Sequence, residues 1–191
     1  MKRIHIILVL ALALSLLAGC AANQTENTAT ASGTEIQFSD GKITAASAGG
    51  VEIDGTALTI TASGTYVLSG SCTDGSVTVE KGVDGVTLVL NGLTLTSETS
   101  APIVCGKESE VTIEAAAGTE NTLSDTESNN DESGNADAEN AVIKCKDGSQ
   151  VMLCGAGTLN VQANGKNGIK SGATTEDGEA SLTIRDLTLN I

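Results

Sequence analysis

The stretch GVTLVLNGLTLTS, residues 85–97, places apolar residues at alternate positions in two short runs. Alternation with a period of two predicts β-strands that bury one face and expose the other. A third apolar run, PIVC at 102–105, follows after a short polar segment. Residues 86–105 therefore predict three short strands in succession.

The same triplet of runs returns along the chain. The second round reads VTIEA (111–115), ENTLS (120–124) and AVIKC (141–145), and the third reads VMLCG (151–155), GTLNV (157–161) and NGIKS (167–171). A fourth round begins at SLTIRDLTLNI (181–191), and ALTIT, TYVLSG and SVTV form an earlier, less regular one. Ile103 precedes Val111, and Ile143 precedes Val151, by the same eight positions. Such regular self-similarity indicates a repeat architecture.

Three short strands per round predict a parallel β-helix, in which rounds stack about 4.8 Å apart and inward residues form columns. The first-strand column holds Val86, Val111, Val151 and Leu182, and the third-strand columns hold Ile103, Ile143 and Ile169, then Cys105, Cys145 and Ser171. The alternative all-β fold is a sandwich of antiparallel hairpins. A sandwich gives no reason for a repeat in threes.

The first 20 residues, MKRIHIILVLALALSLLAGC, begin with positive charge, continue with an apolar run and end in small residues. This pattern predicts a signal peptide over residues 1–19. A transmembrane helix is the alternative, but it needs roughly 20 apolar residues. The ending Leu17-Ala18-Gly19-Cys20 resembles the bacterial lipobox, which implies cleavage before Cys20 and a lipid on its thiol. Residues 20–34 are then a lipidated Cys and a flexible tether, and residues 35–191 form the folded domain.

Loss of residues 1–19 removes the only histidine, His5, and leaves eight basic residues against 24 acidic ones. The absence of histidine excludes His-based catalytic dyads and imidazole metal sites. The negative charge argues against nucleic acid as a partner, because phosphates need basic residues. Only Phe38 and Tyr66 remain as aromatic residues, so stacking against sugar rings is nearly excluded as a binding mode.

Four stretches carry a resemblance to a known family: GTYVLSGSCTDGSVTVE (64–80), GVTLVLNGLTLTS (85–97), AAAGTENTLSD (115–125) and GAGTLNVQANGKNGIKSG (155–172). They resemble the carbohydrate-binding domain family of surface lipoproteins, typified by a cellulose- and pectin-binding lipoprotein of cellulose-degrading anaerobes. The resemblance implies a right-handed, pectate-lyase-like parallel β-helix with bound calcium. It also implies binding of polysaccharide by a protein that is not an enzyme.

The chain departs from the family pattern in two places. The family motif Asn-Asp-Gly-Ile-Lys-Ser-Lys-Asp-Asp corresponds here to Lys-Asn-Gly-Ile-Lys-Ser-Gly, residues 166–172, in which Asn167 replaces an acid. The family also continues with further acidic rounds, whereas this sequence stops at Ile191. We therefore expect the chain to be truncated at its C-terminus, with part of the calcium-binding half missing.

An inserted loop, residues 124–140, lies between the second and third strands of the second round, where 20 positions replace the usual eight. Its Asp, Glu and Asn side chains supply the oxygen ligands that calcium prefers. The alternative is a solvated, disordered acidic loop. The loop ends are the better candidates, because Asp125 and Asn140 border rigid strands and we expect them near Asn164 and Asn167 of the next round.

A second calcium candidate is the turn after the third strand, where Asp147 matches the acid of the family motif and Asp177 falls on the adjacent round. The alternative is the common use of Asp-Gly in a tight turn. The predicted calcium ligands are thus Asp125, Asn140, Asp147, Asn167 and Asp177.

Lys144 and Lys170 share one outward column, so their ammonium groups repel each other and the pKa of one falls. Beside calcium, such a lysine is the general base that a pectate lyase of this fold would use. A lyase with Lys170 and Lys144 as catalytic residues is therefore one alternative. The other is that these lysines pair with acids or, together with Asn164, contact a bound polysaccharide.

Cys145 stacks on Cys105 with a Cα separation of about 4.8 Å, which lies inside the disulfide range. A strict in-register stack also suits two free buried thiols, and both alternatives remain open. No C-x-x-C occurs, so the cysteines do not indicate zinc.

These features predict calcium-assisted, non-catalytic binding of cellulose or pectate by an exported, lipid-anchored monomer at the cell surface, attached to the membrane only through its lipid. A calcium-dependent pectate lyase and a structural adhesin or spacer of the envelope remain as alternative functions.

Overall fold

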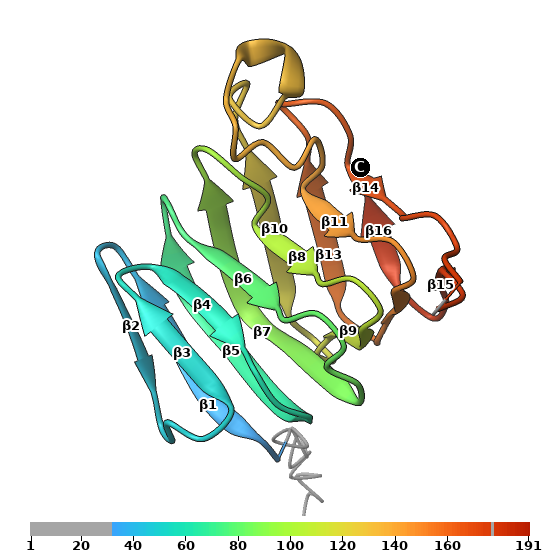
Figure 1. The fold of residues 1–191 in the computed structure, drawn as a ribbon. Helices are drawn as coiled ribbons and strands as arrows, with labels where there is room; N and C mark the ends of the chain where they lie inside the picture. Colours follow the sequence, from blue (N-terminus) through green and yellow to red (C-terminus); the bar gives the residue numbers. More distant parts are fainter. Residues whose placement is uncertain (1–31, 177) are drawn as a thin grey trace, which may run out of the picture.

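The structure, a computed structural model, describes residues 32–176 and 178–191 (Figure 1). The predicted signal peptide, the lipidated Cys20 and Asp177 lie outside the described residues, and the predictions that concern them stay predictions. The described chain is almost entirely β, with one short 3-10 helix at Asp131–Ser133. The all-β prediction is therefore confirmed. No helix in this part of the chain is long and apolar enough to cross a membrane.

The strands form two sheets, one in front of the other in Figure 1. The front sheet runs in the order β14-β11-β8-β6-β4-β3, with bounds Ile169–Lys170, Ile143–Cys145, Ile103–Cys105, Ser76–Val79, Ala57–Ile60 and Val51–Asp54. We call it the six-stranded sheet. It collects the third strand of every round.

The ten-stranded sheet behind collects the first two strands of every round from Val86 onward, whereas ALTIT of the earlier round lies in the six-stranded sheet as β4. Its main path is β15-β12-β9-β7-β10-β13-β16, with bounds Ser181–Ile184, Gln150–Cys154, Glu110–Ala115, Val86–Ser97, Glu120–Asp125, Thr158–Gln162 and Thr188–Asn190. Strand β5 (Gly64–Cys72) pairs with β7, and β1 (Thr34–Ser39) pairs with both β5 and β2 (Lys42–Ala45).

Strands one round apart pair in parallel and in register, as the repeat predicts. The paired residues are the columns Val86–Val111–Val151–Leu182, Ile103–Ile143–Ile169 and Cys105–Cys145. Alternate residues of these strands are buried between the two sheets, where they form one continuous apolar core. Ser171 was predicted to continue the cysteine column, but this is wrong: β14 ends at Lys170 and Ser171 is exposed.

The prediction of three separate strands per round is wrong for the round that begins at Val86. Strand β7 continues through both of the first two segments as one strand of 12 residues. Gly92 adopts the left-handed φ of 73° at the join, a conformation that glycine takes without strain. The buried Asn121 side chain accepts hydrogen bonds there from the backbone N–H of Gly92 and of Leu93, both at 2.9 Å. These two hydrogen bonds hold the bend at Gly92, and the strand continues through it.

The N-terminal end of the fold contains two antiparallel hairpins, β1–β2 and β3–β4. The repeat does not predict them, because they precede its first regular round. Hairpins occur only at this end of the described chain, so a sandwich of hairpins does not describe the fold. The right-handed sense of the rounds stays a prediction.

Candidate functional site

The outer face of the six-stranded sheet presents a single column of side chains, one from each round. Register pairs Thr59 with Thr78, Thr78 with Val104, Val104 with Lys144, and Lys144 with Lys170. Their neighbours along each strand point inward and are buried, as in Ile143 and Cys145 of β11. The column therefore changes from hydroxyl to ammonium groups along the stack.

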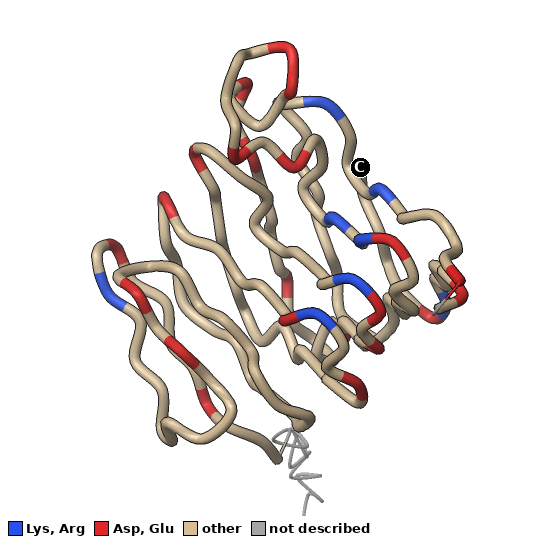
Figure 2. The backbone as a smooth tube through the Cα atoms, in the orientation of Figure 1, with Lys and Arg blue, Asp and Glu red and all other residues tan. Residues whose placement is uncertain are grey.

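Three further lysines lie in the turns that follow the third strands: Lys81 after β6, Lys107 after β8 and Lys146 after β11. Backbone hydrogen bonds stack these turns on one another, for example from the Lys146 N–H to the Cys105 carbonyl at 2.9 Å. With Lys166, six of the eight described basic residues lie on or beside this sheet. Figure 2 shows their blue segments gathered over β8, β11 and β14, whereas acidic segments are spread over the whole molecule.

Three of these lysines are neutralised by ion pairs. Lys81 pairs with Glu108 at 3.1 Å and Lys146 with Glu139 at 2.5 Å. Lys166 lies 2.6 Å from Asp131 and 3.5 Å from Glu132. Within the described chain the other three, Lys107, Lys144 and Lys170, form no ion pair, so their charges are available to a ligand.

The predicted effect of Lys170 on Lys144 is present but is not the largest cause. Burial lowers the pKa of Lys144 first, and repulsion from the Lys170 ammonium lowers it further. The carboxylates of Glu139 and Asp147 act in the opposite direction, toward a higher pKa. Lys144 is thus a partly desolvated ammonium group beside a second one.

An open groove of about 500 Å³ runs across the same face. Its lining includes Thr59, Thr78 and Val104 of the column, and it also contains both charges: Lys81, Lys107 and Lys146 together with Glu80 and Glu139. The groove therefore crosses successive rounds from β4 to the turn after β11. Sequence reasoning identified Lys144 and Lys170 but missed Lys107 and Lys146; the equal length of the turns after Ile103 and Ile143 was the signal that could have placed them.

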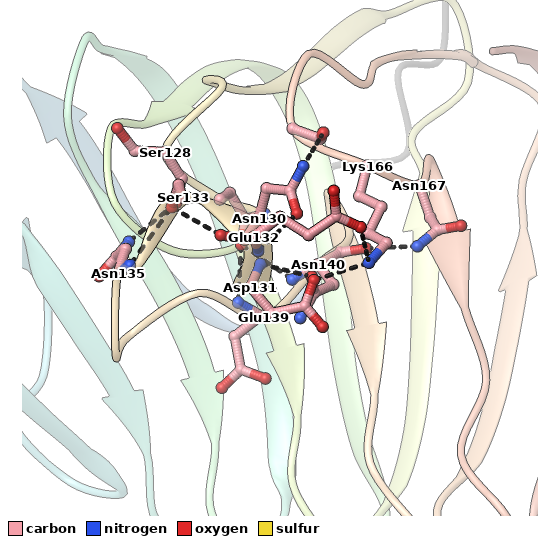
Figure 3. Close-up of polar contacts among 12 residues, drawn as sticks. Ser128, Asn130, Asp131, Glu132, Ser133, Asn135, Glu139, Asn140, Lys166 and Asn167 are labelled. Carbon is pink, nitrogen blue, oxygen red and sulfur yellow. Dashed lines mark hydrogen bonds and ion pairs between the residues drawn. The ribbon is translucent and has the colours of Figure 1, made fainter.

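The inserted loop is an ordered structure and not a disordered acidic segment. Asparagine side chains hold it together (Figure 3): the Asn130 side chain caps the 3-10 helix by accepting from the Glu132 N–H at 3.0 Å, and the Asn135 side chain donates to the Thr99 and Ser128 carbonyls. At the base, the buried Asn129 side chain accepts from the Glu139 and Asn140 N–H groups. These hydrogen bonds disfavour the alternative of a disordered acidic loop.

Asp125 lies at the base of the loop and is 1% exposed, and its carboxylate accepts hydrogen bonds from N–H donors. One carboxylate oxygen accepts from the backbone of Asn164 at 2.6 Å and of Gly165 at 3.0 Å, and the other accepts from the Asn129 side chain at 2.9 Å. These three bonds use the carboxylate to tie the loop to the next round. They occupy three of the about four lone-pair sites of the carboxylate.

The other predicted residues at the loop base do come together, as expected, but they bond to one another. The Asn167 side chain donates to the Asn140 carbonyl at 2.7 Å, and the Asn140 side-chain oxygen accepts from the Asp131 N–H at 2.8 Å (Figure 3). The Asn164 side chain donates to the Asp125 carbonyl at 2.8 Å, so it belongs to this base and not to the lysine column.

Asp147, the remaining predicted ligand in the described chain, lies in the turn after β11. It accepts the Ala173 N–H of the next round at 2.9 Å, and this bond is the main reason its pKa is lowered, helped by the charges of Lys107, Lys144 and Lys146. Its predicted partner Asp177 lies outside the described residues. Within the described chain no group of three or more Asp, Glu, Cys or His side chains is placed to hold a metal ion. Calcium at the predicted positions therefore stays a prediction.

A family of carbohydrate-binding domain-containing proteins matches residues 54–186. The chain belongs to this family. A carbohydrate-binding domain-containing protein from Acetivibrio thermocellus is 32% identical over 152 residues, which cover 79% of this chain and 52% of the relative. The chain thus spans about half the length of that relative.

A solved structure, described as the polysaccharide lyase-like protein from C. thermocellum in a gadolinium derivative, shares the fold with a TM-score of 0.63 and 28% identity. The match covers 82% of this chain and 60% of that chain. In the present carbohydrate-binding domain, Phe38 and Tyr66 are 1% and 3% exposed. Neither ring is available for stacking on a sugar.

Proposed function

We propose that this protein binds plant cell-wall polysaccharide, without cleaving it, along the outer face of the six-stranded sheet. The observation that carries the proposal is the open groove on that face, which crosses successive rounds within the family region and has at its rim Lys107, which forms no ion pair within the described chain. Repeated rounds present an extended surface, which suits a chain-like ligand. Threonine hydroxyls on the groove floor supply hydrogen bonds that a sugar hydroxyl accepts or donates.

The test is retention of the full chain on insoluble polysaccharides, cellulose and polygalacturonate gel, compared with an unrelated acidic protein of similar size. We expect retention on at least one of the two polymers. Equal recovery of both proteins in the unbound fraction would support the alternative of a structural adhesin or spacer.

We further propose the cellular setting that the N-terminal sequence predicts: an exported monomer, held at the cell surface by a lipid on Cys20. We also propose that the parallel rounds form a right-handed β-helix; the in-register pairing of strands one round apart supports this proposal. We also propose calcium assistance of this binding, as the resemblance implies.

A lyase is the second candidate, because Lys144 has a lowered pKa and the solved relative is described as polysaccharide lyase-like. A lysine that releases its proton more readily is a better general base near neutral pH. If the protein is a lyase, polygalacturonate gains the ultraviolet absorbance of an unsaturated product, and the Lys144→Gln and Lys170→Gln variants do not produce it. We expect no such absorbance from the unaltered protein.

A further inference from the structure

We propose that Asn167 is a modification site that loses its side-chain amide by spontaneous deamidation, whereas the fold protects Asn91 and Asn164. The sequence contains three Asn-Gly pairs, at 91–92, 164–165 and 167–168. Glycine after asparagine favours deamidation, because no side chain hinders the close approach of the glycine backbone. This modification does not depend on the proposed function.

Deamidation at an Asn-Gly pair starts at the backbone nitrogen of the glycine. This nitrogen loses its proton to solvent and attacks the asparagine Cγ, so that an N–Cγ bond forms, the Cγ–Nδ2 bond breaks and ammonia leaves. Water then opens the cyclic imide at either carbonyl, which gives aspartate or isoaspartate. An acceptor that binds the glycine N–H opposes the first step, because that hydrogen bond must open before the nitrogen can attack.

Buried acceptors hold the glycine N–H at two of the pairs. The Gly92 N–H donates to the Asn121 side-chain oxygen at 2.9 Å, inside the 12-residue strand β7. The Gly165 N–H donates to a carboxylate oxygen of Asp125 at 3.0 Å. Asn121 is 0% exposed and Asp125 is 1% exposed, so water does not compete for these bonds.

The third glycine, Gly168, is held differently. Its N–H meets no acceptor within residues 32–176 and 178–191, whereas its carbonyl accepts from the Ile143 N–H at 3.0 Å. The Asn167 side chain donates to the Asn140 carbonyl at 2.7 Å, and this bond is made by the nitrogen that leaves (Figure 3). The strand that follows, β14, has only two residues, so less structure must open here than in β7.

Side-chain exposure alone predicts the opposite order of reaction. Asn91 and Asn164 are exposed, and Asn167 is half-buried. The relative rates at these sites therefore distinguish protection of the attacking N–H from simple access of water to the side chain.

Conversion of Asn167 would change the contact between the rounds of β11 and β14. Both products lack the side-chain NH₂ that donates to the Asn140 carbonyl, and both place a carboxylate against that oxygen. Isoaspartate also adds a methylene group to the main chain directly before Ile169, which pairs in register with Ile143. The pairing of β14 with β11 should therefore loosen in the isoaspartate form.

The test follows deamidation by peptide mass spectrometry while the folded full chain is kept warm at mildly alkaline pH. The chain unfolded in urea is the reference, in which every Asn-Gly pair is accessible. We expect Asn167 in the folded chain to convert at least about tenfold faster than Asn91 and Asn164, because a buried hydrogen bond must open first at those two sites. Hydrogen exchange should then show lost protection of the β14 amides. Asn167→Gln should show neither change, since glutamine has to close a larger ring.

Variants at Asn121 test how Asn91 is protected. Asn121→Ala removes the acceptor of the Gly92 N–H and should raise the conversion rate of Asn91 at least about tenfold. Asn121→Asp keeps an oxygen for that N–H and should leave Asn91 slow, although both variants lose the hydrogen bonds that the Asn121 NH₂ donates. Conversion of Asn164 in the same samples reports any global unfolding, which would release every site.

Several results would overturn this assignment. They are conversion of Asn91 or Asn164 ahead of Asn167, equal rates at the Asn-Gly pairs of the folded chain, and no conversion of Asn167 over the time in which the unfolded chain converts. An unchanged rate at Asn91 in Asn121→Ala would show that the acceptor does not protect it. The retention test on polysaccharides is unaffected by any of these results.

Discussion

Lys144 and Lys170 are in-register neighbours on the parallel strands β11 and β14, so two ammonium groups leave the same face of the sheet side by side. Burial is nevertheless the first cause of the lowered pKa of Lys144, and Lys170 is the second. We expect Lys170→Ala to raise the pKa of Lys144 only part of the way to its usual 10.5. A carbon-13 NMR titration of labelled lysines, with Lys144→Gln to assign the resonance, measures this. A full return to the usual value would show that repulsion alone lowers it.

The same lowered pKa makes stability depend on pH. Between the pKa of Lys144 in the folded protein and 10.5, the unfolded chain binds more protons at this residue than the folded chain does. The contribution of Lys144 to the free energy of unfolding therefore rises with pH across that window. Urea unfolding at several alkaline pH values should show a shallower rise for Lys144→Gln than for the unaltered protein. Parallel curves for the two proteins would contradict this expectation.

Asp125 serves the fold as a negative acceptor for three N–H groups. Asp125→Asn turns an NH₂ group toward those donors and should lower the free energy of unfolding by about 3 kcal/mol. Glu127→Gln, which removes an exposed charge from the same loop, should change it by less than about 0.5 kcal/mol. Chemical denaturation with EDTA or calcium present should give the same difference; a calcium-dependent difference would mean that Asp125 binds the ion.

Asn121 is fully buried, and its side-chain oxygen accepts the two hydrogen bonds that hold the bend of β7. Asn121→Ala should lower the free energy of unfolding by about 3 kcal/mol, because the N–H groups of Gly92 and Leu93 lose their acceptor inside the protein. Asn160→Ala, on an exposed face, provides the comparison and should cost less than about 0.5 kcal/mol. Equal losses of unfolding free energy for the two variants would mean that the hydrogen bonds of Asn121 stabilise the fold no more than those of an exposed asparagine.

Cys105 and Cys145 face each other in the core as free thiols. The pKa of Cys105 is raised well above its usual value by its hydrogen bond with Cys145 and by burial. Labelling of a protein that begins at Ser32, unfolded in urea without reductant, should count four thiols: Cys72, Cys105, Cys145 and Cys154. A Cys105–Cys145 disulfide would leave two. In the folded protein only Cys154, which is half-buried, should react quickly.

The stacking of the rounds could be predicted because it depends on short periodic signals. Val86, Val111 and Val151 follow the period of two, and equal turn lengths fix their register. The two N-terminal hairpins could not be predicted in this way, since they do not repeat. Nor could the continuous β7, which depends on a hydrogen bond between Asn121 and residues 28 and 29 positions earlier.

For the site, the sequence placed Lys144 beside Lys170 because neighbouring rounds bring equivalent positions together. It also brought Asp125 near Asn164 and Asn140 near Asn167. The sequence did not reveal the hydrogen bonds of these groups. Asp125 and Asn140 have the oxygen atoms of calcium ligands, and in the fold these oxygens accept N–H groups. Composition does not distinguish these two uses, because the difference lies in the direction of each lone pair.

The inserted loop between β10 and β11 shows where the length of the chain can vary without a change in the fold. The chain leaves the stack at Asp125 and returns at Ile143, and Ile143 still pairs with Ile103 and Ile169 as if the insertion were absent. A corner that is anchored on both sides lets evolution lengthen the segment between its anchors at small cost to the rest of the fold. Relatives could therefore diversify the edge of the six-stranded sheet by exchanging this one segment, and a foreign peptide could be displayed there.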